Sequence, residues 1–206
     1  MSETFYQVVG CIGFALMIAA IIAGARFVAR IRNQARARSM TPLARAIDGR
    51  VEHSDANQNP VIVARHEGRA LRAFASPQVR AGRDDTSLVI NEFSVRVAGV
   101  AGDHGWVARF HVTGLLGQGT RKLHIETREE SLGQALVGDG LLEVLEAFCS
   151  PSADYAAASY DVHTRTLTLT DDVQPKIIPT AERFRRQALL AIEVASLTER
   201  HYATRR

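Results

Sequence analysis

The sequence predicts an α+β fold in which an N-terminal transmembrane helix precedes a curved antiparallel β-sheet packed by C-terminal helices. An uncharged, apolar run opens the chain. Residues 50–127 then alternate between apolar and polar side chains, as strands with one buried face do. From about residue 131 the apolar residues recur every three or four positions, which is typical of helices. Strands followed by helices, without strand–helix–strand alternation, indicate α+β rather than α/β.

The apolar run extends over the 22 residues from Thr4 to Ala25, none of which is charged. As a helix it would be about 33 Å long, against a hydrocarbon core of about 30 Å. We therefore predict a membrane span at about residues 5–29. A cleaved signal peptide is the alternative, because Ala23-Gly24-Ala25 resembles a cleavage site. A signal peptide begins with positive charge, however, and here the only charged side chain before the run is Glu3.

Basic residues follow the run directly. This juxtamembrane basic cluster comprises Arg26, Arg30, Arg32, Arg36 and Arg38. Basic segments stay on the cytoplasmic side, so we expect the N-terminus outside and residues 26–206 in the cytoplasm. Two roles stay open for the cluster: it either binds anionic lipid headgroups, at about 1 kcal/mol per arginine, or only sets the topology.

Small residues recur at helical spacing within the expected span. They are Gly10, Gly13, Ala15, Ala19, Ala23 and Gly24. A face of small residues lets two helix backbones approach closely in lipid, so it is a candidate packing face for a second transmembrane helix. The alternative is that glycine and alanine are simply common in such spans.

The helix is expected to end near Met40, because the residue before a proline is pushed out of the helical region. Thr41-Pro42 would then open a separate short helix that stops at Gly49. This places a boundary between residues 1–40, the transmembrane helix with its basic extension, and residues 41–206, a single cytosolic α+β domain.

We expect a sheet of roughly six or seven strands in this domain. Eight segments are candidates for them: residues 49–53, 61–66, 69–75, 87–100, 106–114, 121–128, 155–161 and 165–172, the last two forming a hairpin. Phe93, Val95 and Val97 have the opposite parity to Leu88 and Ile90, which predicts a bulge near Asn91-Glu92.

Helices are expected at residues 131–137, 140–148 and 181–200. The last should bury a stripe formed by Phe184, Ala188, Ala191, Ile192 and Ala195. Arg183, Arg186, Glu193 and Glu199 are expected in solvent.

The charge balance argues against nucleic acid as a partner. Five of the 25 basic and one of the 22 acidic side chains lie in residues 1–40, which leaves 20 basic and 21 acidic side chains in the domain. Nucleic-acid binding needs a basic surface that neutralises phosphates. The two cysteines, Cys11 and Cys149, lie in different regions and are not expected to pair.

No motif for catalysis, cofactor or metal binding occurs: the chain lacks GxxxxGK[ST], GxSxG, HExxH and CxxC. His111 and His124 fall on polar strand faces, and the pairs Glu129-Glu130 and Asp171-Asp172 look like capping and solubility features. We therefore expect no enzyme and no cofactor, with one alternative: a site whose residues converge only in space.

The stretch ETREESLGQALVGDGLLEVLEAFCSPSADYAAASYDVHTRTLTLTDD and the helix after it resemble the C-terminal half of uncharacterised bacterial single-pass proteins. The resemblance covers about eighty residues. It rests on Gly138-Asp139, Leu141-Leu142, Tyr160-Asp161, Leu167-Thr168-Leu169 and Phe184. It implies a bacterial inner-membrane address and carries no known activity or site.

These observations lead to two hypotheses about function. The first is a non-enzymatic, membrane-anchored accessory or scaffold subunit of a bacterial inner-membrane complex. Its partners would be the lipid bilayer and another membrane protein, contacted through the transmembrane helix and the cytosolic domain. The alternative is a tethered cytosolic domain that binds a lipid or a small apolar ligand between the sheet and its helices.

Overall fold

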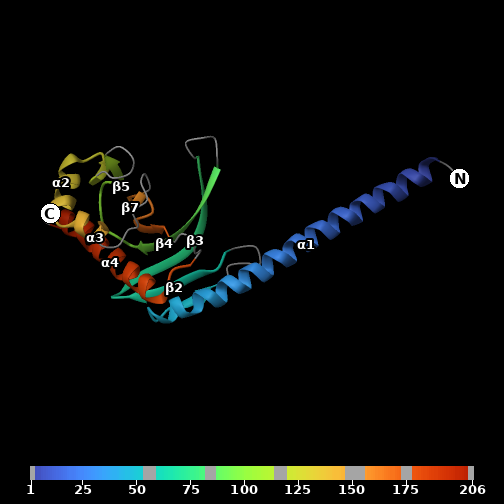
Figure 1. The fold of residues 1–206 in the computed structure, drawn as a ribbon, viewed down its shortest axis with the longest axis horizontal. Helices are drawn as coiled ribbons and strands as arrows, with labels where there is room; N and C mark the ends of the chain where they lie inside the picture. The colour runs from blue at the N-terminus through green and yellow to red at the C-terminus, as the bar shows by residue number, and fades with distance from the viewer. Residues whose placement is uncertain are drawn as a thin grey trace.

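The computed structural model describes residues 3–52, 59–81, 87–113, 120–146, 156–172 and 178–203. It consists of one very long N-terminal helix, an eight-stranded antiparallel sheet and helices that follow it, so the predicted α+β fold is confirmed. Figure 1 shows the long helix extending away from the sheet, with the two chain termini at opposite ends of the molecule.

The long helix α1 spans Glu3–Arg45. The strands are β1 (Arg50–Glu52), β2 (Val61–His66), β3 (Arg69–Ala81), β4 (Ser87–Ala98), β5 (Trp106–Thr113), β6 (Thr120–Thr127), β7 (Ala156–Asp161) and β8 (Thr166–Asp172). Their order in the sheet is β1-β2-β3-β4-β8-β7-β5-β6. The late hairpin β7–β8 is therefore inserted between β4 and β5, and β1 and β6 form the two edges.

The bulge predicted near Asn91-Glu92 is not present. The β3–β4 register runs without a shift from Leu71 opposite Val97 to Ala81 opposite Ser87. Every residue of β3 pairs with one residue of β4 over this range, so the two strands stay in register although the parity of the apolar residues changes between Ile90 and Phe93. The register shift that the structure does contain lies between Ala108 and Arg109, where β5 pairs with β7.

Helix α1 does not end before Pro42, as the sequence predicted, but continues through it to Arg45. Proline cannot donate to the carbonyl one turn earlier, yet it lies in the last turn of α1, where little of the helix remains to be interrupted. Met40 and Leu43, on either side of it, are buried in the domain core. Thr41 Oγ1 also donates a hydrogen bond to the Ala37 carbonyl at 3.0 Å. Packing thus overrides the local preference for a break, and the separate helix from Thr41 to Gly49 does not form.

The remaining helices are α2 (Glu130–Gly138), α3 (Leu141–Glu146) and α4 (Ala181–Ala203). Helix α4 packs against β4 and β8 and also contacts the end of α1 and both short helices. Its predicted stripe is confirmed, since Phe184, Ala188, Ala191, Ile192 and Ala195 are all buried. The ring of Phe184 meets that of Phe93 on β4 edge to face, with centroids 5.6 Å apart.

The apolar part of α1 has no such partner. Residues 12–45 contain a stretch long and apolar enough to cross a membrane, and none of that stretch is buried inside the protein. Large apolar side chains stand exposed all around it, among them Phe14, Leu16, Ile18, Ile21 and Phe27. Only from Ala37 onward does the helix enter the core. The division of the chain at residue 40 stays a prediction.

Candidate functional site

The junction between α1 and β1 is a tight turn. Asp48 adopts a left-handed backbone conformation with φ of 52°, and the Gly49 N–H donates to the Ala44 carbonyl at 2.8 Å. A Cβ on Gly49 would come within 2.8 Å of the Val63 carbonyl oxygen and 2.9 Å of the Ala64 Cβ. Glycine here therefore lets the turn lie directly on β2, and β1 returns beneath the end of the helix.

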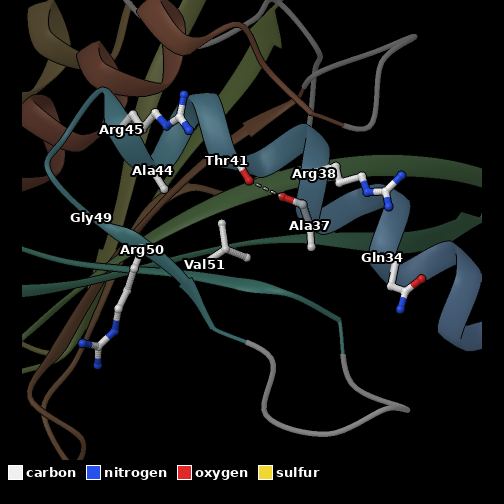
Figure 2. Close-up of a pocket in the computed structure, with 9 residues that line it drawn as sticks. All are labelled: Gln34, Ala37, Arg38, Thr41, Ala44, Arg45, Gly49, Arg50 and Val51. Atoms are coloured by element: carbon white, nitrogen blue, oxygen red, sulfur yellow. Dashed lines mark hydrogen bonds between the residues drawn. The ribbon is translucent and has the colours of Figure 1, made fainter.

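A groove of about 570 Å³ lies beside this junction, between one flank of α1 and β1, and we call it the α1–β1 groove. Figure 2 shows its lining residues, which are Gln34, Ala37, Arg38, Thr41, Ala44, Arg45, Gly49, Arg50 and Val51. Small apolar side chains from both walls form its floor, and polar or charged side chains surround it. No residue from β2 lines it, so the groove opens at the outer edge of the sheet.

The groove carries uncompensated positive charge. Among the residues that the structure describes, neither Arg38 nor Arg45 has a hydrogen-bond or ion-pair partner. The guanidinium of Arg50 pairs with the carboxylate of Glu52 at 2.7 Å, in an exposed position where such a pair contributes little. Residues 34–52, which run along the groove, hold four arginines against two acids, so this segment carries a net positive charge.

The five arginines of the predicted basic cluster lie in different surroundings in the structure. Arg26, Arg30 and Arg32 are exposed along the free part of α1. Arg36 is half-buried and donates from Nη1 to Asn59 Oδ1 at 2.6 Å, so it ties the helix to the segment before β2. Arg38 lines the α1–β1 groove together with Arg45 and Arg50, which lie outside the predicted basic cluster. Their spacing on one flank becomes visible only when the helix is continued through Pro42.

The predicted packing face lies along the free part of α1. Gly13 and Gly24 have no side chain or backbone of another element within 4 Å of where a Cβ would stand. Ala15, Ala19 and Ala23 are exposed. Gly10 lies in the same helix, but its surroundings are outside what the structure describes. The proposed contact with a second transmembrane helix stays a prediction.

A polar cluster at the other end of the sheet was not predicted. His104 Nδ1 lies 3.0 Å from Glu129 Oε2, and His201 Nε2 lies 4.0 Å from the other oxygen of the same carboxylate. The His104 backbone N–H donates to the Tyr202 hydroxyl at 3.1 Å. These contacts hold the end of α4 against the segments before β5 and after β6. Residues about 100 positions apart meet here, so no local pattern in the sequence could have predicted this cluster.

An adjacent cleft of about 860 Å³ is lined by residues that include His104, Trp106 and Tyr160. Burial raises the pKa of the Tyr160 and Tyr202 phenols. Both therefore stay protonated at neutral pH, whereas a nucleophile or general base needs a depressed or matched pKa. Across the described ranges, no group of three or more histidine, cysteine, aspartate or glutamate side chains is placed to hold a metal ion.

Of the α4 side chains expected in solvent, Glu199 is more buried than predicted, whereas Arg183 is 41% exposed, as predicted, but holds a buried carboxylate. Arg183 makes a two-point contact with Asp171, a carboxylate that is completely buried, with Nε to Oδ2 at 2.6 Å and Nη2 to Oδ1 at 2.7 Å. Glu199 is half-buried and accepts from Arg69 Nη1 at 3.1 Å and from the Ala101 N–H at 3.0 Å. The hydrogen bonds from Arg69 are the main cause of the lowered pKa of Glu199. Both pairs join α4 to the sheet.

A cavity of about 70 Å³ lies between α4, the turn after α1, and strands β2 and β3. Pockets for small ligands commonly measure about 300–1,000 Å³, so this cavity is too small for a lipid or a drug-sized molecule. A larger pocket of about 570 Å³ lies between β6 and α2, lined by residues that include Ile125, Gly133 and Val137. Binding of an apolar ligand between the sheet and its helices stays a prediction.

No protein-family model matches the chain, and comparison with curated proteins and with solved structures finds no match.

Proposed function

We propose that this protein is a membrane-anchored, non-enzymatic accessory or scaffold subunit of a bacterial inner-membrane complex. Helix α1 would cross the bilayer with its N-terminus outside, and residues 26–206 would lie in the cytoplasm. The proposal is supported above all by α1 itself, which is apolar on all sides over the described residues up to Ala25 and continues unbroken into the core.

The continuity of α1 bears on what the anchor does. Met40, Leu43 and Ala44 are part of the same core as the sheet and α4. A flexible linker would leave the domain free to reorient, whereas a continuous helix fixes its orientation relative to the span. A domain held rigidly beside a membrane is suited to positioning a partner, and this favours a scaffold over an independent soluble activity.

Anchorage is tested by one substitution made at two places. Ile18 on α1 and Leu189 on α4 are similarly exposed, at 40% and 43%. An arginine at the centre of a membrane helix costs about 2.5–3.5 kcal/mol of insertion free energy. We therefore expect Ile18→Arg to shift the protein out of carbonate-washed membranes, while Leu189→Arg stays in them. Equal retention of both variants would exclude the span.

Topology and partnership need separate measurements. Protease added to inverted inner-membrane vesicles should digest the domain, and protease added to intact spheroplasts should not. Affinity purification in a mild detergent should recover the protein together with another membrane protein. A mature protein beginning near residue 26 in the periplasm, or a lone monomer in every mild detergent, would overturn the corresponding part of the proposal.

A further inference from the structure

The arginines that follow the span divide into two groups by their height above the membrane. At 1.5 Å per residue, Arg26 to Arg32 lie within about 10 Å of the end of the apolar run at Ala25, in reach of the headgroups. Measured from residue 29, where the predicted span ends, Arg38 and Arg45 lie about 14 and 24 Å above the hydrocarbon core. Since charges are screened over about 8 Å at physiological salt, Arg45 is too distant to bind the lipid in which α1 is anchored, and Arg38 lies farther from it than Arg26 to Arg32 do.

The upper arginines are spaced for an extended ligand. Arg38 and Arg45 are seven residues apart, so they share a flank of α1 and are separated by about 10 Å along its axis. Figure 2 shows their guanidinium groups pointing in different directions, with Arg50 directed away from the helix. A single phosphate would reach only one of them. Carboxylates on one face of an extended chain lie two or four residues apart, at about 7 or 13 Å, and the flexible arginine and glutamate side chains bridge the difference from about 10 Å.

The walls of the groove suit the backbone and apolar side chains of such a chain. The floor contains Ala37, Ala44 and Val51. One wall is β1, which ends the sheet and has no strand neighbour on its outer side among the described residues. An extended peptide can add to a free edge of this kind, with main-chain hydrogen bonds to the strand.

We propose that the α1–β1 groove binds an acidic, extended segment of a partner protein, with Arg38 and Arg45 pairing with its carboxylates. Charge complementarity with the arginines that line the groove selects the partner. The inference rests on the proposed membrane anchorage in one respect, which is the exclusion of the anchoring lipid as the ligand.

Binding is measured with the full-length protein in phosphatidylcholine nanodiscs and a fluorescent peptide of alternating glutamate and valine. We expect the affinity for the peptide to fall as the salt concentration rises. We also expect it to be lower by about tenfold or more in the double variant Arg38→Glu/Arg45→Glu. The matched control is Arg72→Glu/Arg186→Glu, which makes the same charge change at two exposed arginines away from the groove. Equal losses in the two variants would refute a specific site.

Other anions are compared in the same assay. Neither inorganic phosphate nor phosphatidylglycerol in the nanodisc should displace the peptide, and displacement by either would overturn the proposal of an extended protein ligand. So would an oligonucleotide that binds more tightly than the peptide and is lost in Arg38→Glu/Arg45→Glu. A photo-reactive amino acid at Gln34 should cross-link to the peptide. Carbonate extraction reports on anchorage independently, so failure of the anchor and failure of the groove are distinguishable.

Discussion

Helices α1 and α4 are both long, and they differ in how their apolar residues are arranged. In α4 the apolar residues form one stripe, and this stripe is buried against β4 and β8. Between residues 12 and 28 of α1 the apolar residues occur on every side, and all of them are exposed. A stripe can be satisfied by one protein face, whereas an all-apolar surface requires an apolar medium around it. Periodicity therefore separates the two helices better than hydrophobicity does.

The two environments also meet within α1. Its last turns bury Ala37, Met40, Leu43 and Ala44, which recur at helical spacing and face the sheet. The same helix thus changes from unpatterned to patterned within about two turns, and the groove with its arginines lies at this change. If the comparison holds, replacing a buried apolar residue of α4 should destabilise the domain, and replacing an apolar residue on the free part of α1 should not.

The largest expected effect comes from Phe184 on α4. Phe184→Ala removes a ring that is fully buried against Phe93, and such substitutions cost about 3–5 kcal/mol of unfolding free energy. Urea unfolding in detergent, followed by the fluorescence of the single tryptophan, Trp106, measures it. Phe27→Ala is the matched control, because Phe27 is exposed on α1, and we expect no change in domain unfolding. A similar loss in both variants would contradict the distinction between the helices.

The ion pair between α4 and β8 should give the next largest effect. Arg183→Met leaves the carboxylate of Asp171 buried without its main positive partner, which we expect to cost about 3 kcal/mol of unfolding free energy. The double variant Arg183→Met/Asp171→Asn removes the buried charge as well and should recover part of the loss. The same unfolding assay checks both. Additive losses in the double variant would show that the two side chains do not depend on each other.

Features with a local period were predictable from the sequence. The α+β class, the approximate positions of the strands and the buried stripe of α4 follow from alternation and helical spacing, which act over a few residues. The length of β3 does not, since it was expected to end at residue 75 and extends to Ala81. The break at Pro42 was predicted wrongly because the preference of a pre-proline residue is weak compared with burial of Met40 and Leu43. The register of β3 and β4 likewise depends on pairing with a partner strand.

The candidate sites were less predictable, because their residues come together from distant parts of the chain. Arg38 was identified, but Arg45 and Arg50 were not, since their place in the groove depends on the continuity of α1. Glu129 and His201 looked unremarkable in the sequence and meet only where α4 ends beside α2. The burial of Asp171 could not be inferred, because an acidic pair at the end of a strand is usually exposed.

Gly49 tests whether the α1–β1 junction is as tightly packed as the α4 interface. In Gly49→Ala the new methyl group would meet the Val63 carbonyl and the Ala64 Cβ, and relieving this overlap should cost about 1–3 kcal/mol of unfolding free energy. Gly138→Ala is the control, since that position has nothing within 4 Å. We expect it to leave stability unchanged or slightly raised. An unchanged Gly49→Ala would mean that the end of α1 is held less closely than α4.

The smallest effect concerns Glu199, which joins α4 to Arg69 at the start of β3. The pKa of its carboxyl is lowered in the folded protein, first by hydrogen bonds from Arg69 and further by the Ala101 N–H, against burial that raises it. A carboxyl whose folded pKa is depressed stabilises the fold above its unfolded pKa of about 4.3, and the contribution is lost as the pH falls through the folded pKa. We therefore expect Glu199→Gln to cost about 1 kcal/mol of unfolding free energy at pH 7, because the pair is partly exposed. The difference in unfolding free energy from the wild type should shrink below about pH 4.

Glu193→Gln removes the same charge from an exposed position of α4 and should leave the pH profile of unfolding unchanged. If the cost of Glu199→Gln were the same at pH 7 and in acid, its carboxylate charge would not contribute to holding α4 on the sheet, and the apolar stripe alone would account for the contrast with α1.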